Sequence, residues 1–425
     1  MGDAPRVARP DSSLTKASSR ALLGLPRPVW LLGLGSLLTD TASEAIYPLL
    51  PIFLTRVLGA TAFSLGLIEG AAEAANSLLK VLSGHVSDRW NRRKPIVLAG
   101  YSLSSAVRPL IGLVTSWPQV LLIRFTDRVG KGVRGAPRDA ILAGCATPET
   151  RGRVFGFHRA MDHVGAILGP TLATLFLLAW PGEYRSLFVA TLVPGALAVW
   201  MLSLVREDET AGAGLAGSTR RSAAAPGQAP TSGSLERMPR GYYGFLGVLL
   251  LFTLGNSADA FLLLRLTDIG IHPAMIPLLW AALHVVKASV SVVGGLQSDR
   301  MGRRSIIGIG WIVYALVYGG FALATSPATL IACFLTYGFY YGFAEGTEKA
   351  FIADLAPASL RGTAFGVYNA VLGVGSFVAS VLFGLIWKQF GAPTAFGTGA
   401  VLALASTVLL FVAVHERRPS RPSGL

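Results

Sequence analysis

Ionisable side chains recur at helical spacing inside apolar stretches of this 425-residue chain. In one stretch Glu69, Glu73 and Lys80 share a face with Asn76. In another, six charged residues fall within about 120° of arc at 100° per residue: Arg124, Asp127, Arg128, Lys131, Arg134 and Arg138. A charge at the centre of a bilayer costs ~3 kcal/mol or more, so such residues mark a proton, ion or substrate pathway, or buried ion pairs.

The candidates for that pathway are polar residues on these and equivalent faces. They are Asp40, Glu44, Glu69, Glu73, Arg124, Arg128, Lys131, Asp162, His163, Asp259, His284, Lys287, Tyr341 and Glu345. Burial disfavours a charged carboxylate, which favours the acids of the first two stretches as proton carriers, and histidine titrates near neutral pH. Ion pairing is the alternative role, because buried bases and acids are nearly equal in number in the N-terminal half.

The stretches that carry these residues have the composition of membrane helices. Hydrophobic residues make up 52% of the chain and charged residues 14%, against about 25% charged in soluble domains. This excludes a soluble enzyme and a disordered chain. Lipid-length apolar stretches must be helical, because backbone polar groups need partners inside the bilayer. We expect spans over 29–54, 62–86, 96–115, 118–144, 153–180, 186–205, 241–265, 274–297, 305–324, 328–353, 363–387 and 394–413.

The net charge of +14 follows the topology of these spans. Lys and Arg gather in the tails and the even-numbered connections, so both termini are expected in the cytoplasm. Because the topology accounts for the positive charge, the charge no longer argues for nucleic-acid binding. The expected parts are a tail at 1–27, a six-helix bundle at 28–205, a linker at 206–240, a second bundle at 241–413 and a tail at 414–425. Cys145 and Cys333 suggest neither a disulfide framework nor a metal site.

Two motifs repeat at one offset. Ser87–Arg93 (SDRWNRR) returns as Ser298–Arg304 (SDRMGRR), 211 residues later, and the Arg-Gly-x-x-Phe-Gly of 151–156 returns at 361–366. The chain is therefore two related halves. In secondary transporters built this way, the substrate site lies between the halves near the membrane midplane.

The repeated basic motif resembles motif A of the major facilitator superfamily. Its residues are Gly84, Asp88, Arg89, Arg92 and Arg93, with a second copy at Gly295, Asp299, Arg300, Arg303 and Arg304. The resemblance implies an all-α membrane fold of twelve helices in two pseudo-symmetric bundles, with both motifs acting as gates. At an offset of 210, which also relates 151–156 to 361–366, Arg138-Asp139 aligns with Glu348-Lys349, in inverted charge order. We expect these four gating residues to meet near the cytoplasmic ends of spans 118–144 and 328–353.

Two further motifs bear on the direction and coupling of transport. Gly156, Gly165, Gly169 and Pro170 are similar to the antiporter motif of this family, although Ala173 and Thr174 stand where two glycines are usual. Small residues let helices approach closely and proline bends a helix. The stretch from Arg124 to Gly130 resembles the arginine-containing motif of the fourth span, which implies a role for Arg124 in proton coupling.

These observations predict a secondary active transporter of the cytoplasmic (inner) membrane that moves a small organic solute by alternating access. We expect coupling to protons, with efflux as the favoured direction. The alternative is an importer, symporter or exchanger, of an organic anion such as a metabolite or siderophore, because the arginines of span 118–144 suit carboxylates. A non-transporting membrane sensor is the third possibility. The sequence contains no phosphate loop, His-rich metal cluster or Gly-x-Ser-x-Gly elbow. We therefore expect no enzyme activity, no cofactor, no metal, and a monomer whose partners are solute, H⁺ and lipid.

Overall fold

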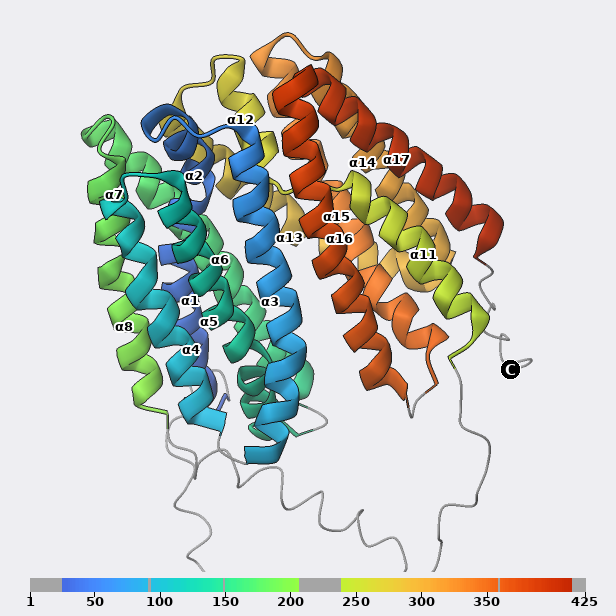
Figure 1. Cartoon of the computed structure of the whole chain (residues 1–425). Coiled ribbons are helices and arrows are strands. Elements are labelled where there is room, and N and C mark those ends of the chain that lie inside the picture. Colours follow the sequence, from blue (N-terminus) through green and yellow to red (C-terminus); the bar gives the residue numbers. More distant parts are fainter. Residues whose placement is uncertain (1–24, 91–92, 148–149, 206–237, 358–359, 415–425) are drawn as a thin grey trace, which may run out of the picture.

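The computed structural model describes residues 25–90, 93–147, 150–205, 238–357 and 360–414, and nearly all of them are helical (Figure 1). The N-terminal half begins with α1 (Arg27–Ile46), which continues through short turns as far as Val57. It goes on with α3 (Ala62–Trp90), α4 (Arg93–Val107) and its 3₁₀ extension to Leu113, α5 (Trp117–Gly144), α6 (Arg151–Ala179), α7 (Tyr184–Ala190) and α8 (Leu192–Ser203).

The C-terminal half repeats this order. It consists of α11 (Arg240–Gly255), α12 (Ala260–Asp268), α13 (Ile276–Met301) after a 3₁₀ turn at Pro273–Met275, α14 (Arg303–Leu323), α15 (Pro327–Leu355), α16 (Arg361–Phe390) and α17 (Ala392–Ala413). Every stretch predicted to span is helical, so the predicted all-α fold with two bundles is confirmed. Two spans break locally: the first at Tyr47–Val57, which contains Pro48 and Pro51, and the seventh at residues 256–259.

Eight helical segments among the described residues are long and apolar enough to cross a membrane. The predicted spans that fall outside this set belong to α1, α3, α5 and α15. These are the helices on which the ionisable candidates concentrate, including Glu44, Glu69, Arg128 and Glu345. The least lipid-like helices are therefore the ones that need partners inside the protein.

The two halves touch along α3 and α16, and α6 packs against α13. We call the end of the bundles that holds Phe53–Val57, the start of α3, α12 and the end of α16 the closed end. Here Gly66 lies against the carbonyl oxygen of Ser380 and Gly384 against the backbone of Ala62. At the opposite end, where α3, α5, α13 and α15 finish, α3 and α16 diverge (Figure 1). We call this the basic end.

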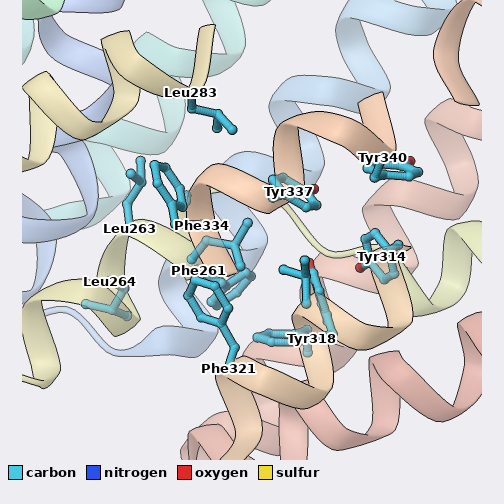
Figure 2. Close-up of a cluster of buried hydrophobic side chains, with 14 of the residues drawn as sticks. Phe261, Leu263, Leu264, Leu283, Tyr314, Tyr318, Phe321, Phe334, Tyr337 and Tyr340 are labelled. Atoms are coloured by element: carbon cyan, nitrogen blue, oxygen red, sulfur yellow. The ribbon is translucent and has the colours of Figure 1, made fainter. Parts of the chain in front are cut away.

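The core of the C-terminal half is aromatic. Phe252 stacks on Trp311 with ring centroids 4.4 Å apart, and Tyr314 stacks on Tyr318 at 4.1 Å. Figure 2 shows Tyr314, Tyr318, Tyr337 and Tyr340 gathered between α14 and α15. Such large, rigid rings fix α15, and with it the polar face that α15 turns toward the other half.

Candidate functional site

A cavity of about 450 Å³ lies between the two halves. The N-terminal half lines it with polar side chains of α1, α3 and α5: Glu44, Tyr47, Glu69, Glu73, Asn76, Ser77, Lys80 and Arg128. The C-terminal half contributes mainly aromatic, amide and hydroxyl groups together with acids: Asn256, Ser257, Asp259, Trp280, His284, Tyr340, Tyr341, Glu345, Glu348, Lys349, Tyr368, Asn369, Ser376 and Ser380. Both walls therefore carry charged groups, and the wall of the C-terminal half is in addition rich in hydroxyl and ring groups.

Behind the N-terminal wall, buried arginines neutralise two acids. Nη2 of Arg124 lies 2.9 and 3.0 Å from the two carboxylate oxygens of Glu69, and its Nε lies 3.2 Å from Oε1. Arg108 pairs with Asp127 at 2.9 Å, and Arg124 lies 3.7 Å from the same acid. All four side chains are almost fully buried. They hold α3, α4 and α5 together, which is the pairing role anticipated for part of these charges.

Arg128 differs from these arginines. It faces the cavity one turn from Arg124, and within the described part of the chain no carboxylate lies within ion-pair distance of its guanidinium. Lys80 also reaches the cavity, nearer the basic end, without an ion-pair partner among the described residues. The guanidinium N–H groups of Arg128 are therefore available to donate hydrogen bonds to a ligand in the cavity.

The break between α11 and α12 places Asp259 in the opposite wall. Its carboxylate accepts hydrogen bonds from the hydroxyls of Tyr337 at 2.9 Å and Tyr341 at 3.0 and 3.1 Å. The ammonium of Lys287 lies 3.4 Å from the centre of the Tyr341 ring. Asp259 therefore keeps its place through neutral donors, with a cation nearby but outside direct contact.

Tyrosines form a part of the site that sequence reasoning found only in part, because it placed Tyr337 and Tyr341 on the polar face of their span but not Tyr340. Tyr340 accepts a hydrogen bond from the amide of Asn256 at 2.9 Å, and the hydroxyls of Ser257 and Tyr318 lie 3.0 Å apart. Only Tyr341 of this group was among the predicted site residues. The repeat of tyrosine at 337, 340 and 341 on one helix was the available signal.

Glu44 and Trp280 join the halves at the floor of the cavity, on the side of the closed end. The indole N–H of Trp280 donates to the Glu44 carboxylate at 2.8 Å. Its ring lies 5.1 Å from Tyr47 and 5.0 Å from His284. The Nε2 atom of His284 is buried and lacks a hydrogen-bond partner among the described residues.

Several predicted pathway residues do not line the cavity. Lys287 lies behind Tyr341, and Arg124 behind Glu69. Asp162 lies between α1 and α6, where Ser36 donates to it at 2.6 Å and His158 lies 3.5 Å away. The other such residues are Asp40, Lys131 and His163, which are half-buried. His158, a buried partner of Asp162, had not been singled out from the sequence.

Comparison with known proteins identifies the architecture. The Major Facilitator Superfamily model matches residues 32–266 and again 244–425. The chain belongs to the major facilitator superfamily. An uncharacterized MFS-type transporter of Methanocaldococcus jannaschii is 36% identical over 392 residues, covering 91% of this chain and 94% of the relative. The resemblance inferred from the repeated basic motif is therefore confirmed, and the protein is a multi-pass membrane transporter by family.

More distant superfamily members have named solutes. A probable 4-methylmuconolactone transporter of Cupriavidus pinatubonensis is 26% identical, covering 89% of this chain and 88% of that protein. The crystal structure of a D-xylose-proton symporter has a TM-score of 0.68 at 15% identity, covering 92% of this chain and 98% of that one. The latter likeness shows the shared fold alone.

The superfamily's basic motif is only partly described in this structure. Gly84, Asp88, Arg89, Arg92 and Asp299 fall outside the residues whose side chains the structure describes. In the second copy, Arg303 lies 3.4 Å from Asp354 and donates to Ser298 at 2.6 Å. Arg304 donates to the carbonyl of Val414 at 2.6 Å, whereas Gly295 and Arg300 are exposed. In the first copy Arg93 reaches the carbonyl of Ala140 at 3.5 Å, so both motifs tie neighbouring helix ends.

Among the described residues, no ion pair joins Arg138 or Asp139 to Glu348 or Lys349. Arg138 pairs with its neighbour Asp139 at 2.9 Å, and Lys349 pairs with Glu345 at 2.9 Å, each inside one half. Glu348 instead accepts hydrogen bonds from Trp311 at 3.0 Å and Tyr368 at 3.4 Å. At the basic end, where these residues lie, α3 and α16 diverge (Figure 1).

Two of the antiporter-like glycines serve close helix packing. A side chain at Gly169 would collide with the carbonyl of Thr41, and one at Gly165 would lie 2.6 Å from the carbonyl of Leu37, so α6 presses on the backbone of α1. Gly156 faces open space, and Pro170 lies within α6 without ending it. The packing role therefore falls on Gly165 and Gly169.

Proposed function

We propose that this member of the superfamily is a proton-coupled transporter of a small organic anion in the cytoplasmic membrane. Its basic end and both termini would face the cytoplasm, as the distribution of Lys and Arg favours. The halves at 28–205 and 241–413 would rock about the cavity, exposing it to one side at a time. From the sequence alone, efflux is the favoured direction and import of an organic anion is the alternative. With an organic anion proposed as the solute, uptake by symport with H⁺ becomes the first candidate for the direction of transport.

The guanidinium of Arg128 carries this proposal. It lines the cavity with no carboxylate of the described residues in ion-pair distance, while Glu69, Asp259 and Glu345 have donors of their own. A guanidinium binds a carboxylate with two parallel hydrogen bonds. The hydroxyls of Tyr340 and Tyr341 across the cavity can bind a polar substituent on the far side of the same solute. The name of the methylmuconolactone relative supports an organic acid or its lactone as solute.

Export is the second candidate direction. The observation that favours it is the close packing of Gly165 and Gly169 on α1, the part of the antiporter-like motif that this chain retains. Uptake and export differ in the sign of the response to a pH gradient. An inwardly directed proton gradient would drive accumulation by a symporter and expulsion by an antiporter.

The experiment is a two-stage assay on the full chain. A panel of organic acids is first screened by thermal stabilisation of the purified protein, and the acids that bind are then followed into proteoliposomes under imposed pH gradients of either sign. Replacing Arg128 by Gln is expected to weaken binding roughly tenfold or more, because a charge-assisted two-pronged contact is lost. Arg138→Gln, on the same helix but already paired with Asp139, is the matched control. Equal losses in both variants, or binding of neutral and cationic solutes alone, would contradict an anion site at Arg128.

A further inference from the structure

Glu44 is the cavity acid that contacts the other half of the protein. Among the side-chain to side-chain hydrogen bonds found between described residues, the bond from Trp280 to Glu44 is the one that crosses from one half to the other. The other crossing hydrogen bond, from Arg56 to the carbonyl of Thr267, ends on backbone at the closed end. The Trp280 side chain is 4% exposed, so this contact is shielded from water.

The chemistry of the contact makes it sensitive to a proton. A hydrogen bond to a carboxylate is charge-assisted and roughly twice as strong as one between neutral groups. Protonation of Glu44 would therefore weaken the bond that links α1 to α13. No basic group of the described residues forms an ion pair with Glu44. Protonation of Glu44 therefore leaves no buried cation without its counter-ion. Glu69 differs, since its protonation would abandon the buried Arg124.

The charged groups around Glu44 come from both halves. They are Asp40 on α1, Arg128 and Lys131 on α5, His284 on α13 and Asp259 before α12, with His163 on α6 and Lys287 on α13 facing His284 in turn. Arg128 and Lys131 favour the carboxylate, and His284 does so only when protonated, whereas the two acids and burial favour the neutral form. Among these groups, the Trp280 N–H is the donor that is present only while the closed end is shut.

We propose that the Glu44–Trp280 hydrogen bond is a proton-operated lock on the closed end. When the closed end opens, α13 must leave α1, and Glu44 loses the donor that stabilises its charge. Proton binding and conformation are linked, so each affects the other equally. Glu44 therefore binds a proton more tightly in the state in which the closed end has opened, and releases it in the state described here. A proton would then enter from the side of the closed end and leave toward the basic end.

The lock deepens the proposed function. It rests on that function only for the claim that the proton's movement is coupled to transport. Its test reads conformation and needs no substrate. Spin labels are placed at Val57 and Met275, exposed residues of opposite halves at the closed end, in full-length protein whose Cys145 and Cys333 are replaced by alanine. Distance distributions between the labels are then measured in lipid nanodiscs from acid to alkaline pH.

Lowering the pH is expected to raise the population with long distances in the otherwise unchanged protein. Glu44→Gln and Trp280→Phe should each favour long distances by roughly tenfold over the unchanged protein at alkaline pH, and should abolish most of the pH response. Trp311→Phe is the matched control, because Trp311 donates to Glu348 at 3.0 Å within one half, and its variant should keep the response.

Two results would overturn the lock: an unchanged pH response in Glu44→Gln, or a loss of response in Trp311→Phe equal to that in Trp280→Phe. The failure of the proposed function is separate from both. If no organic anion binds or moves but the distances respond as expected, the lock stands and the anion assignment falls. If anion flux persists while Glu44→Gln keeps its pH response, the transporter stands and another group carries the proton.

Discussion

Arg124 on α5 holds both carboxylate oxygens of Glu69 on α3, with its Nη2 atom 2.9 Å from one and 3.0 Å from the other. The side chains of the pair are 4% and 6% exposed. The pair therefore joins the two most charged helices of the N-terminal half inside the protein. It also removes the Glu69 charge from the cavity that Glu69 borders.

The first prediction concerns this pair. Glu69→Gln leaves a buried guanidinium with only the 3.7 Å contact to Asp127, and should destabilise the protein by ~3–5 kcal/mol. Asp139→Asn removes the partner of Arg138 in a half-exposed pair, where a loss of at most about 1 kcal/mol is expected. Thermal unfolding of both variants in detergent measures the difference. Similar melting temperatures would show that Arg124 finds other compensation.

The second prediction concerns the donors to Asp259. Tyr341→Phe and Tyr337→Phe each remove one hydroxyl donor to a charged acceptor, which should cost ~1.5–3 kcal/mol. The double variant leaves the carboxylate without either donor and should lose more than the sum of the single losses. A double-mutant cycle of unfolding free energies tests this coupling. Strict additivity would mean that the two hydroxyls stabilise the protein independently of each other.

The third prediction separates two glycines of the same motif. Gly169→Ala should destabilise the packing of α6 on α1 by ~1–3 kcal/mol, because its methyl group has no room beside Thr41. Gly156→Ala, on the same helix but facing open space, should be neutral or slightly stabilising, since alanine is the better helix former. Unfolding temperature and initial flux should both follow this order. A larger effect at Gly156 would contradict the packing role.

The fourth prediction concerns the basic end. In a chain without Cys145 and Cys333, cysteines introduced at Asp139 and Lys349 should cross-link poorly in the state described here. Cross-linking should rise several-fold when Gly66 is replaced by Leu, because that side chain would wedge against Ser380 and force the closed end apart. The readout is a gel shift after a short bifunctional reagent. An unchanged yield would show that the two ends do not move together.

Much of the fold and part of the site could be predicted from the sequence. Helix lengths, the repeat and the charged faces of α3 and α5 follow from residue spacing, and these faces place Glu69, Glu73 and Arg128 at the cavity. The rotation of α6 depends on how closely Gly165 and Gly169 let it approach α1, which spacing alone cannot give. The position of Asp162 away from the cavity therefore depends on the tertiary packing of α6 on α1.

Contacts between the halves were the hardest to predict. The offset of 211 places Trp280 on α13 at the position that Glu69 has on α3. Trp280 nevertheless meets Glu44 of α1, because α13 packs against α6 beside α1 whereas α3 packs against α16. The meeting of Arg138-Asp139 with Glu348-Lys349 stays a prediction for a state in which the basic end is closed. Residue spacing does not show which end of the two bundles is open in a given conformation.

The charge on α5 has a consequence for how the protein enters the membrane. Each Arg or Lys at the centre of an isolated helix costs about 2.5–3.5 kcal/mol on insertion, and α5 carries Arg124, Arg128, Lys131 and Arg134 with one central acid, Asp127. A newly made α5 would resist partitioning into lipid on its own. The cost of inserting α5 falls when Glu69 of α3 and Arg108 near α4 lie beside it, because they pair with Arg124 and Asp127. The first four spans should therefore leave the insertion channel as a group.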